Sequence, residues 1–99
     1  MKQTNKETIE NYSNILENLF DEKLITEDPG NANYRYMLAI VYEKLGKGNK
    51  MINSFLASYK NDTTYLKPIY KLAIIFKKIR KKDSSNLFIK KGLELNGKN

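Results

Sequence analysis

The sequence predicts an all-α protein, a short helical-repeat solenoid of about five antiparallel helices. The first reason is a repeat: segment 36–47 returns as segment 70–81, with identical residues at half of the paired positions. The second is spacing, because apolar residues recur every three or four positions and no segment alternates apolar with polar residues. The two segments are 34 residues apart, and a helical repeat of this length buries its apolar face by stacking on a neighbouring repeat. The identical pairs are Tyr36/Tyr70, Leu38/Leu72, Ala39/Ala73, Ile40/Ile74, Lys44/Lys78 and Lys47/Lys81.

A single amino-terminal helix is expected within residues 4–27. Thr4 and Glu7 fit a capping box, in which each side chain accepts a hydrogen bond from a backbone N–H at the helix start. The predicted helix runs continuously over about residues 6–26 and ends before Pro29, which cannot extend the hydrogen-bond ladder. Its apolar residues step by three and four positions and form one stripe, made of Ile9, Tyr12, Leu16, Leu19, Phe20 and Leu24.

Two helical hairpins follow, at residues 32–65 and 66–97, and complete one domain over residues 1–99. Glycines at both ends of the segment 46–48 separate the helices of the first hairpin. Pro68 falls in the first turn of the next helix, where its missing N–H costs little. Side-chain caps are predicted for the second helix of each hairpin, at Asn49 and at Asp83 to Ser85.

Composition limits the chemistry that the chain can perform. It contains no Cys and no His, which removes thiol chemistry, the commonest general base and the commonest zinc ligands. No combination of Ser, Lys and carboxylate resembles a nucleophile with its base. The carboxylates also lack the spacing of an EF-hand calcium loop. We therefore expect no catalytic site, no cofactor and no metal.

Charge is distributed unevenly along the chain, whose net charge is +7. Residues 1–30 carry three Lys against seven acidic residues, whereas residues 64–99 carry ten Lys or Arg against two acidic residues. The two ends are therefore oppositely charged, at −4 and +8. The first residues lack the apolar stretch of a signal peptide, and the longest apolar run, 72–76, is too short to span a bilayer. We expect a cytoplasmic protein without a transmembrane segment.

Small and aromatic residues recur in both hairpins at one spacing, namely Leu38, Ala39, Tyr42, Gly46, Phe55 and Ser58, then Leu72, Ala73, Phe76, Ile89 and Gly92. This pattern resembles the tetratricopeptide (TPR) repeat, a family with 34-residue helical hairpins. The resemblance covers residues 32–96, as one repeat over 32–65 and another over 66–97. Arg35 and Ile69 depart from the family's Trp. Met51 replaces a small residue and is expected to splay the first hairpin slightly.

The resemblance implies a ligand groove on the first helix of each repeat. Tyr36 and Ile40 recur there as Tyr70 and Ile74, which suits a protein or peptide with apolar anchors and acidic neighbours. In the alternative interpretation, the amino-terminal helix fills this groove and uses the same residues as core. The groove positions are Asn33, Tyr36, Ile40, Glu43 and Lys44 in the first repeat, and Lys67, Tyr70, Ile74, Lys77 and Lys78 in the second.

Two further surfaces are candidate binding sites. TPR arrays usually finish with a covering helix, and the apolar residues Leu87, Phe88, Ile89 and Leu93 have none after them in this sequence. They are expected to form an interface with a partner, or with the acidic first helix of another copy. Arg80, Lys81 and Lys82 form a basic patch suited to an acidic partner.

These observations predict a non-catalytic protein–protein interaction adaptor or a small subunit of a larger assembly. Two alternatives stay open. One is a basic nucleic-acid or ribosome-associated protein, whose affinity would fall steeply with salt. The other is a secretion-type chaperone that holds an unfolded partner. The basic residues available to the first alternative are Lys67, Lys71, Lys77, Lys78, Arg80, Lys81 and Lys82.

Overall fold

The computed structural model describes residues 3–97, apart from the side chains of residues 3–7, 9, 13 and 22. Within this range the predicted all-α fold is confirmed, with five helical regions and no strand. The side chains of the capping box predicted at Thr4 and Glu7 lie outside the described residues. The helices are α1 (Gln3–Asn18), which continues into the π-helix η1 (Leu19–Ile25), α2 (Ala32–Leu45), α3 (Gly48–Asn61), α4 (Leu66–Lys78) and α5 (Lys82–Asn96).

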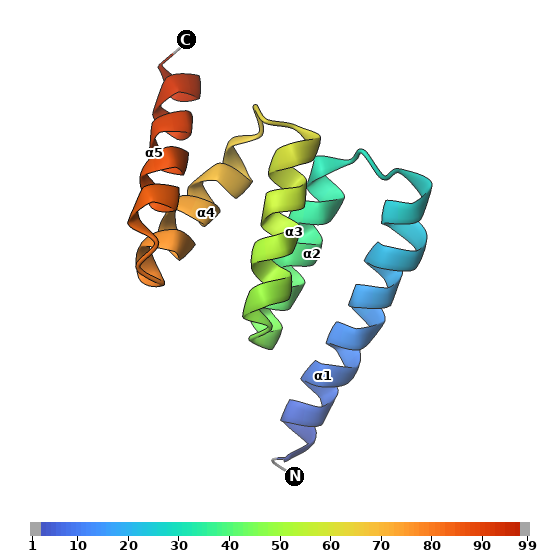
Figure 1. The fold of residues 1–99 in the computed structure, drawn as a ribbon. Coiled ribbons are helices and arrows are strands. Elements are labelled where there is room, and N and C mark those ends of the chain that lie inside the picture. Colours follow the sequence, from blue (N-terminus) through green and yellow to red (C-terminus); the bar gives the residue numbers. More distant parts are fainter. Residues whose placement is uncertain (1–2, 98–99) are drawn as a thin grey trace.

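The helices succeed one another across the molecule in chain order, from α1 at one end to α5 at the other (Figure 1). The molecule measures 50 × 33 × 20 Å, and its radius of gyration is 15.0 Å. A compact domain of this length has a radius of gyration of about 13 Å. Its accessible surface is 7006 Å², against about 5800 Å² for a typical monomer of this mass. The elongated arrangement therefore leaves unusually large helix faces in contact with solvent.

The turns inside the two hairpins have the same backbone conformation. Gly46 and Arg80, which occupy equivalent positions of the repeat, both adopt a left-handed conformation, with φ of 73° and 63°. The next N–H then donates back to the preceding helix, from Lys47 to the carbonyl of Tyr42 (3.0 Å) and from Lys81 to that of Phe76 (2.8 Å). Both helices thus end with a C-terminal cap, in which a left-handed residue lets the following N–H donate back to a carbonyl of the last turn. The sequence repeat is also a backbone repeat.

The predicted side-chain caps of α3 and α5 are wrong. These helices begin at Gly48 and Lys82, immediately after the left-handed turn, and in neither does a side chain at the N-cap accept a hydrogen bond from a backbone N–H of the first turn. Asn49 and Asp83 therefore lie inside the first turn. Ser85 is buried, and its hydroxyl donates to the carbonyl of Ala73 (2.9 Å), which joins α5 to α4.

The first helix is also not the continuous α-helix that was predicted. Its α-helical part ends at Asn18 and is followed by the π-helical turn η1. Phe20 and Ile25 lie five positions apart and are both buried against α2. Hydrogen bonding from i to i+5 places such a pair on one side of the helix. The π-turn thereby lets both side chains reach the same neighbouring helix.

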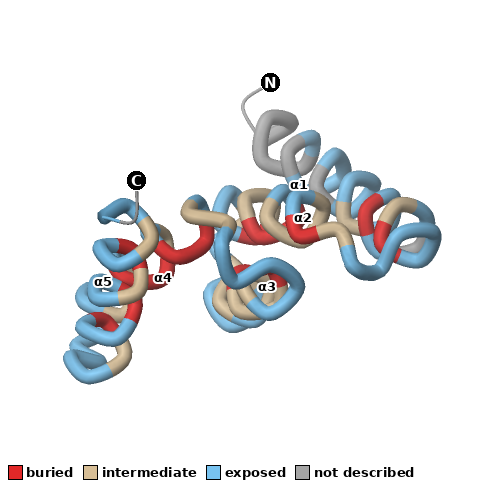
Figure 2. The backbone as a smooth tube through the Cα atoms, turned by 90° about the horizontal axis from the view of Figure 1, so that it is seen from above, coloured by how far each residue is buried: buried red, intermediate tan, exposed pale blue. Residues whose placement is uncertain are grey.

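The buried residues form two clusters in the interior of the stack (Figure 2). The smaller cluster joins η1 to α2 and consists of Phe20, Ile25, Leu38 and Tyr42. The larger cluster joins the two hairpins and consists of Ala39, Phe55, Ile69, Leu72, Ala73 and Phe88.

Candidate protein-interaction face

Two of the groove residues predicted on α2, Tyr36 and Ile40, are packed in the joint between the two hairpins, whereas Asn33, Glu43 and Lys44 are exposed. The ring of Tyr36 lies 5.5 Å from that of Phe55 and 5.7 Å from that of Tyr65, which precedes α4. The Tyr65 hydroxyl donates to Asn33 (3.0 Å), and the Lys67 ammonium group lies 5.8 Å from the centre of the Tyr36 ring. Ile40, also on α2, packs against the same core cluster. The start of α4 therefore occupies the site where a ligand was expected.

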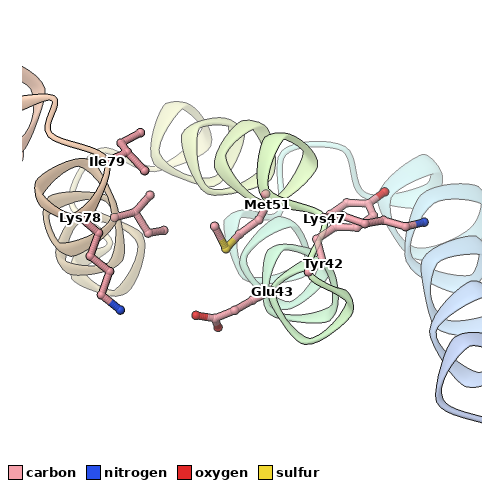
Figure 3. Close-up of a pocket in the computed structure, with 9 residues that line it drawn as sticks. Tyr42, Glu43, Lys47, Met51, Lys78 and Ile79 are labelled. Carbon is pink, nitrogen blue, oxygen red and sulfur yellow. The ribbon is translucent and has the colours of Figure 1, made fainter. Parts of the chain in front are cut away.

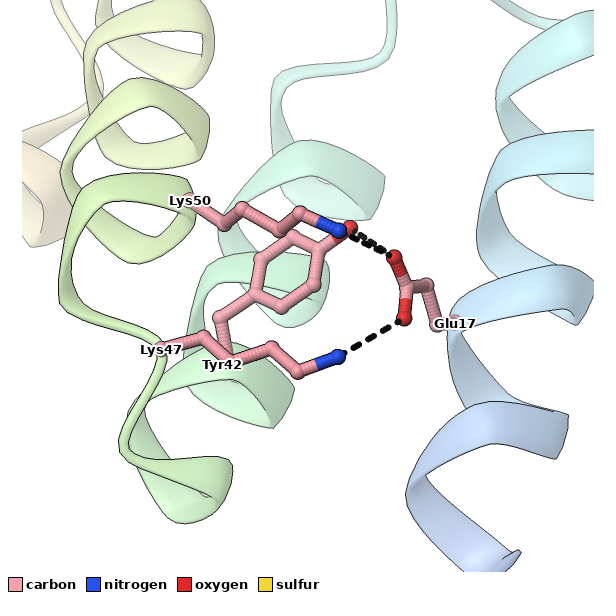
Figure 4. A network of polar contacts seen from close by, with 4 residues as sticks. All are labelled: Glu17, Tyr42, Lys47 and Lys50. Carbon is pink, nitrogen blue, oxygen red and sulfur yellow. Dashed lines mark hydrogen bonds and ion pairs between the residues drawn. The ribbon is translucent and has the colours of Figure 1, made fainter. Parts of the chain in front are cut away.

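The amino-terminal helix does not fill this groove. It packs on another side of α2, where η1 meets Leu38 and Tyr42. Figure 4 shows how α1 is attached there: the Tyr42 hydroxyl donates to the Glu17 carboxylate (2.6 Å), and Lys50 lies 3.4 Å from the same oxygen. Lys47 lies 3.7 Å from the other oxygen. The first hairpin is thus covered by α1 and η1 on one side and by α4 on another.

Ionisation supports this attachment at neutral pH. The hydrogen bond from Tyr42, together with the positive charges of Lys50 and Lys47, lowers the pKa of the Glu17 carboxyl group. Burial, and then the neighbouring Glu17 carboxylate, raises the pKa of the Tyr42 hydroxyl above its ordinary value. Glu17 is therefore held as the charged acceptor and Tyr42 as the neutral donor.

The second hairpin leaves the corresponding face open to solvent. Phe55 is completely buried in the joint, whereas Ile89, its counterpart in the second repeat, is 43% exposed. The counterparts of Ile40 and Tyr59, which are Ile74 and Leu93, are 54% and 66% exposed, although Ile40 and Tyr59 pack on the core. We call this surface the free face; it consists of Tyr70, Ile74, Ile89 and Leu93.

A glycine shapes one edge of the free face. The ring of Tyr70 lies directly against the backbone of Gly92 in α5, where a Cβ atom would come within 2.8 Å of the ring. A larger residue at this position would push the Tyr70 ring away from α5. Gly92 thus lets an exposed aromatic side chain lie close against α5, where its ring can contact a partner.

Two cavities beside the hairpin turns reveal the same relationship. The first, of about 290 Å³, includes Gly46 and Met51 and is closed on its far side by Ile75 and Ile79 from the α4 region (Figure 3). The second, of about 340 Å³, is lined entirely by α4, α5 and the turn between them. Most of its lining positions are the repeat equivalents of positions that line the first cavity. Its lining residues are Lys77, Arg80, Lys82, Ser85, Asn86 and Ile89.

The carboxy-terminal interface predicted from the sequence needs correction. Phe88 is 5% exposed and belongs to the core, where it stacks on Phe76 (5.9 Å) and meets the edge of Tyr59 (5.3 Å). Leu87 is exposed, but it lies two positions before Ile89 and therefore about 200° away around α5. Of the four predicted residues, only Ile89 and Leu93 belong to the free face.

The basic residues are divided between two surfaces, although the three residues of the predicted patch, Arg80, Lys81 and Lys82, line one hollow at the turn between α4 and α5. Lys71 forms an ion pair with Glu43 of α2 (3.0 Å), and Lys67 lies over Tyr36, so both face the first hairpin. Lys77 lines the cavity of the free face, whereas Lys78 lines the cavity of the first hairpin. Within the predicted patch, Arg80 and Lys82 border the free face. Lys44 and Lys81 are exposed.

Sequence reasoning missed an apolar surface on α1. The residues of the predicted stripe do not share one environment: Tyr12, Leu16 and Leu19 are exposed, Phe20 is buried, and the side chain of Ile9 lies outside the described residues. Ile15, which the predicted stripe did not include, is also exposed. The sequence held only part of this signal: Leu24 lies about 120° from Tyr12 around a helix, whereas Phe20 lies only about 40° from Leu16. We call Tyr12, Ile15, Leu16 and Leu19 the α1 stripe.

Comparison of the sequence with protein-family models and with curated proteins finds no match. The resemblance to TPR repeats therefore rests on the residues themselves and stays a prediction. Among residues 3–97, no helix is long and apolar enough to cross a membrane. No group of three or more acidic side chains in the described part of the chain could hold a metal ion.

Proposed function

We propose that the chain is a non-catalytic, TPR-like protein–protein interaction adaptor, or a small subunit of a larger assembly, that binds its partner through the free face. The observation that carries this proposal is the difference between equivalent positions, which are buried or partly buried in the first hairpin and exposed in the second. Apolar side chains gathered on an open helical face favour a partner over solvent. The predicted cytoplasmic location belongs to the same proposal.

The covered hairpin indicates what the partner should look like. There, an amphipathic helix, α4, directs Leu72 and Ile75 to the joint, and Lys71 pairs with Glu43. At the free face, Lys77 stands at the position that corresponds to Glu43. A partner helix docked as α4 is would therefore need a carboxylate where α4 has Lys71. The expected partner is an amphipathic helix with apolar residues on one side and acidic residues beside them.

Mutation of the free face tests this proposal. Tagged protein is used to capture partners from native lysate, and Ile89→Lys is compared with Leu87→Lys. Both residues are similarly exposed on α5, but only Ile89 belongs to the free face. We expect Ile89→Lys to lose the partner and Leu87→Lys to retain it. The reason is that an apolar contact would remove the hydration of the new ammonium group, which is energetically costly. Equal capture by both variants would contradict the proposal.

The same capture separates the nucleic-acid alternative. A complex held by phosphate contacts weakens steeply as salt rises, whereas an apolar contact weakens little. We expect the captured partner to persist in high salt and after nuclease treatment. Loss of capture under both conditions, with Ile89→Lys behaving as wild type, would favour the basic residues as the binding surface.

A further inference from the structure

The α1 stripe is a second unpartnered apolar surface, and it is continuous. Its members follow the spacing i, i+3, i+4 and i+7, which places them side by side on one face of a helix. Tyr12 and Ile15 are 65% and 62% exposed. Phe20 and Glu17, which attach the same helix to α2, point elsewhere. The helix thus packs on its own chain with one face and presents a different apolar face to solvent.

The α1 stripe and the free face lie at opposite ends of the molecule. α1 is the first helix of the stack and α5 the last, with α2, α3 and α4 between them (Figures 1 and 2). The chain is 50 Å long in its longest dimension. The two surfaces therefore cannot cover one another within a single chain, whereas an end of one copy can meet the opposite end of another.

Charge favours contact between unlike ends. Residues 1–30 carry a net charge of −4 and residues 64–99 a net charge of +8. Asp21 and Glu27, which follow the α1 stripe in the sequence, are exposed. Lys77, Arg80 and Lys82 border the free face. Two free faces brought together would oppose these basic groups to one another, which is costly. The acidic end of a second copy supplies the opposite charge.

We propose that the free face binds the α1 stripe of a second copy of this chain, so that copies associate head to tail. This inference rests on the proposed function of the free face and names its partner. The contact extends the stack in the same order of elements, because α1 of the next copy lies against the last hairpin. A head-to-tail contact closes into a ring or continues as a filament.

Complementation between two variants tests this assembly. Ile15→Lys disables the α1 stripe and Ile89→Lys disables the free face, and both replaced residues are exposed, so folding is retained and is verified by circular dichroism. We measure mass by light scattering and sedimentation from micromolar to millimolar concentration. Wild type is expected to grow to at least twice its monomer mass of 11.5 kDa, while each variant stays monomeric. An equimolar mixture should form a dimer that grows no further, because only one intact contact remains.

Each other outcome overturns the inference. A wild-type protein that stays monomeric at millimolar concentration excludes self-association. If wild type forms a dimer and Ile15→Lys forms it too, the dimer is a symmetric contact between other surfaces. Monomeric variants whose mixture also stays monomeric show that the two surfaces do not bind one another. In all three cases the capture experiment with Ile89→Lys and Leu87→Lys still decides whether the free face binds a different protein, so the two proposals fail separately.

Discussion

The two hairpins share one backbone plan and differ in what covers them. The α2–α3 hairpin is covered by α1 and η1 on one side and by α4 on another, whereas the α4–α5 hairpin is covered only by the first hairpin. Residues at equivalent positions of the repeat, such as Phe55 and Ile89, are therefore buried in the first hairpin and exposed in the second. In a stack of repeats, burial depends on the neighbouring unit as much as on the residue's own unit.

The largest expected difference between the hairpins is at Phe55 and Ile89. Phe55→Ala removes a fully buried ring and is expected to lower the free energy of unfolding by about 3–5 kcal/mol. Ile89→Ala acts on an exposed side chain and is expected to change it by less than about 0.5 kcal/mol. Denaturant titration of dilute protein measures both values. Similar losses for the two variants would mean that Ile89 is also core.

Features with a local cause were predictable from the sequence. The repeat, the apolar spacing and Pro68 placed the four later helices and both hairpin turns, because turn and helix signals act over short stretches of chain. Ala39 and Ala73, which recur at equivalent positions of the repeat, are both buried. Tyr70 and Ile74 are exposed, which agrees with the groove interpretation, whereas Tyr36 and Ile40, assigned to the same groove, are packed on the core.

Features set by a neighbouring element were not predictable in this way. Tyr36 fits a groove or a joint equally well, and only the position of α4 decides between them. Phe88 and Ile89 are adjacent apolar residues on α5, so composition cannot tell which one faces the core. The π-turn at η1 likewise depends on the need to bring Phe20 and Ile25 to the same helix.

The turns provide a second comparison. Gly46 and Arg80 share a left-handed conformation that residues with a Cβ atom adopt at a cost of about 1–2 kcal/mol. Gly46→Ala is expected to lower stability by about 1 kcal/mol, and Arg80→Gly to raise it by up to about 1 kcal/mol. Thermal and denaturant unfolding measure the changes. A loss of stability in Arg80→Gly would indicate that the Arg80 side chain makes a contact that outweighs its backbone strain.

The amino-terminal cover of the first hairpin should depend on pH. The pKa of Glu17 lies below its ordinary value of 4.5, so the attachment of α1 is fully stabilised above pH 4.5 and weakens as pH falls through the lowered pKa. As the pH falls, amides in α1 and η1 are expected to lose protection from hydrogen exchange before amides in α4 and α5 do. Protection is calculated relative to the intrinsic exchange rate at each pH. Glu17→Gln should cost about 1 kcal/mol and flatten this local dependence.

A matched variant isolates the Glu17 effect, because other carboxylates also titrate in acid. Glu10→Gln changes an exposed residue of the same helix and is expected to leave the acid response of α1 as it is in wild type. If Glu17→Gln and Glu10→Gln respond alike, the contact with Tyr42 does not hold α1 in place.

The smallest expected effect concerns the ion pair across the joint. Glu43 and Lys71 are both partly exposed, so Glu43→Ala is expected to lower stability by only about 0.2–1 kcal/mol, and less in high salt. Lys77→Ala, at the corresponding position of the free face, should leave the stability of the monomer unchanged. A larger loss for Lys77→Ala would reveal a partner for Lys77 within the chain.

The central claim is that the free face is equivalent to the face that α4 covers. It is tested most directly by appending a second copy of residues 66–79 after Asn99, which preserves the spacing of the repeat. In this added helix, Glu replaces the residue that corresponds to Lys71. The matched control carries Lys at the positions that correspond to Leu72 and Ile75. We expect the added helix to raise the free energy of unfolding by roughly 2 kcal/mol and to slow hydrogen exchange in α5, relative to the control. Equal stability and equal exchange in the two extended chains would contradict the claim.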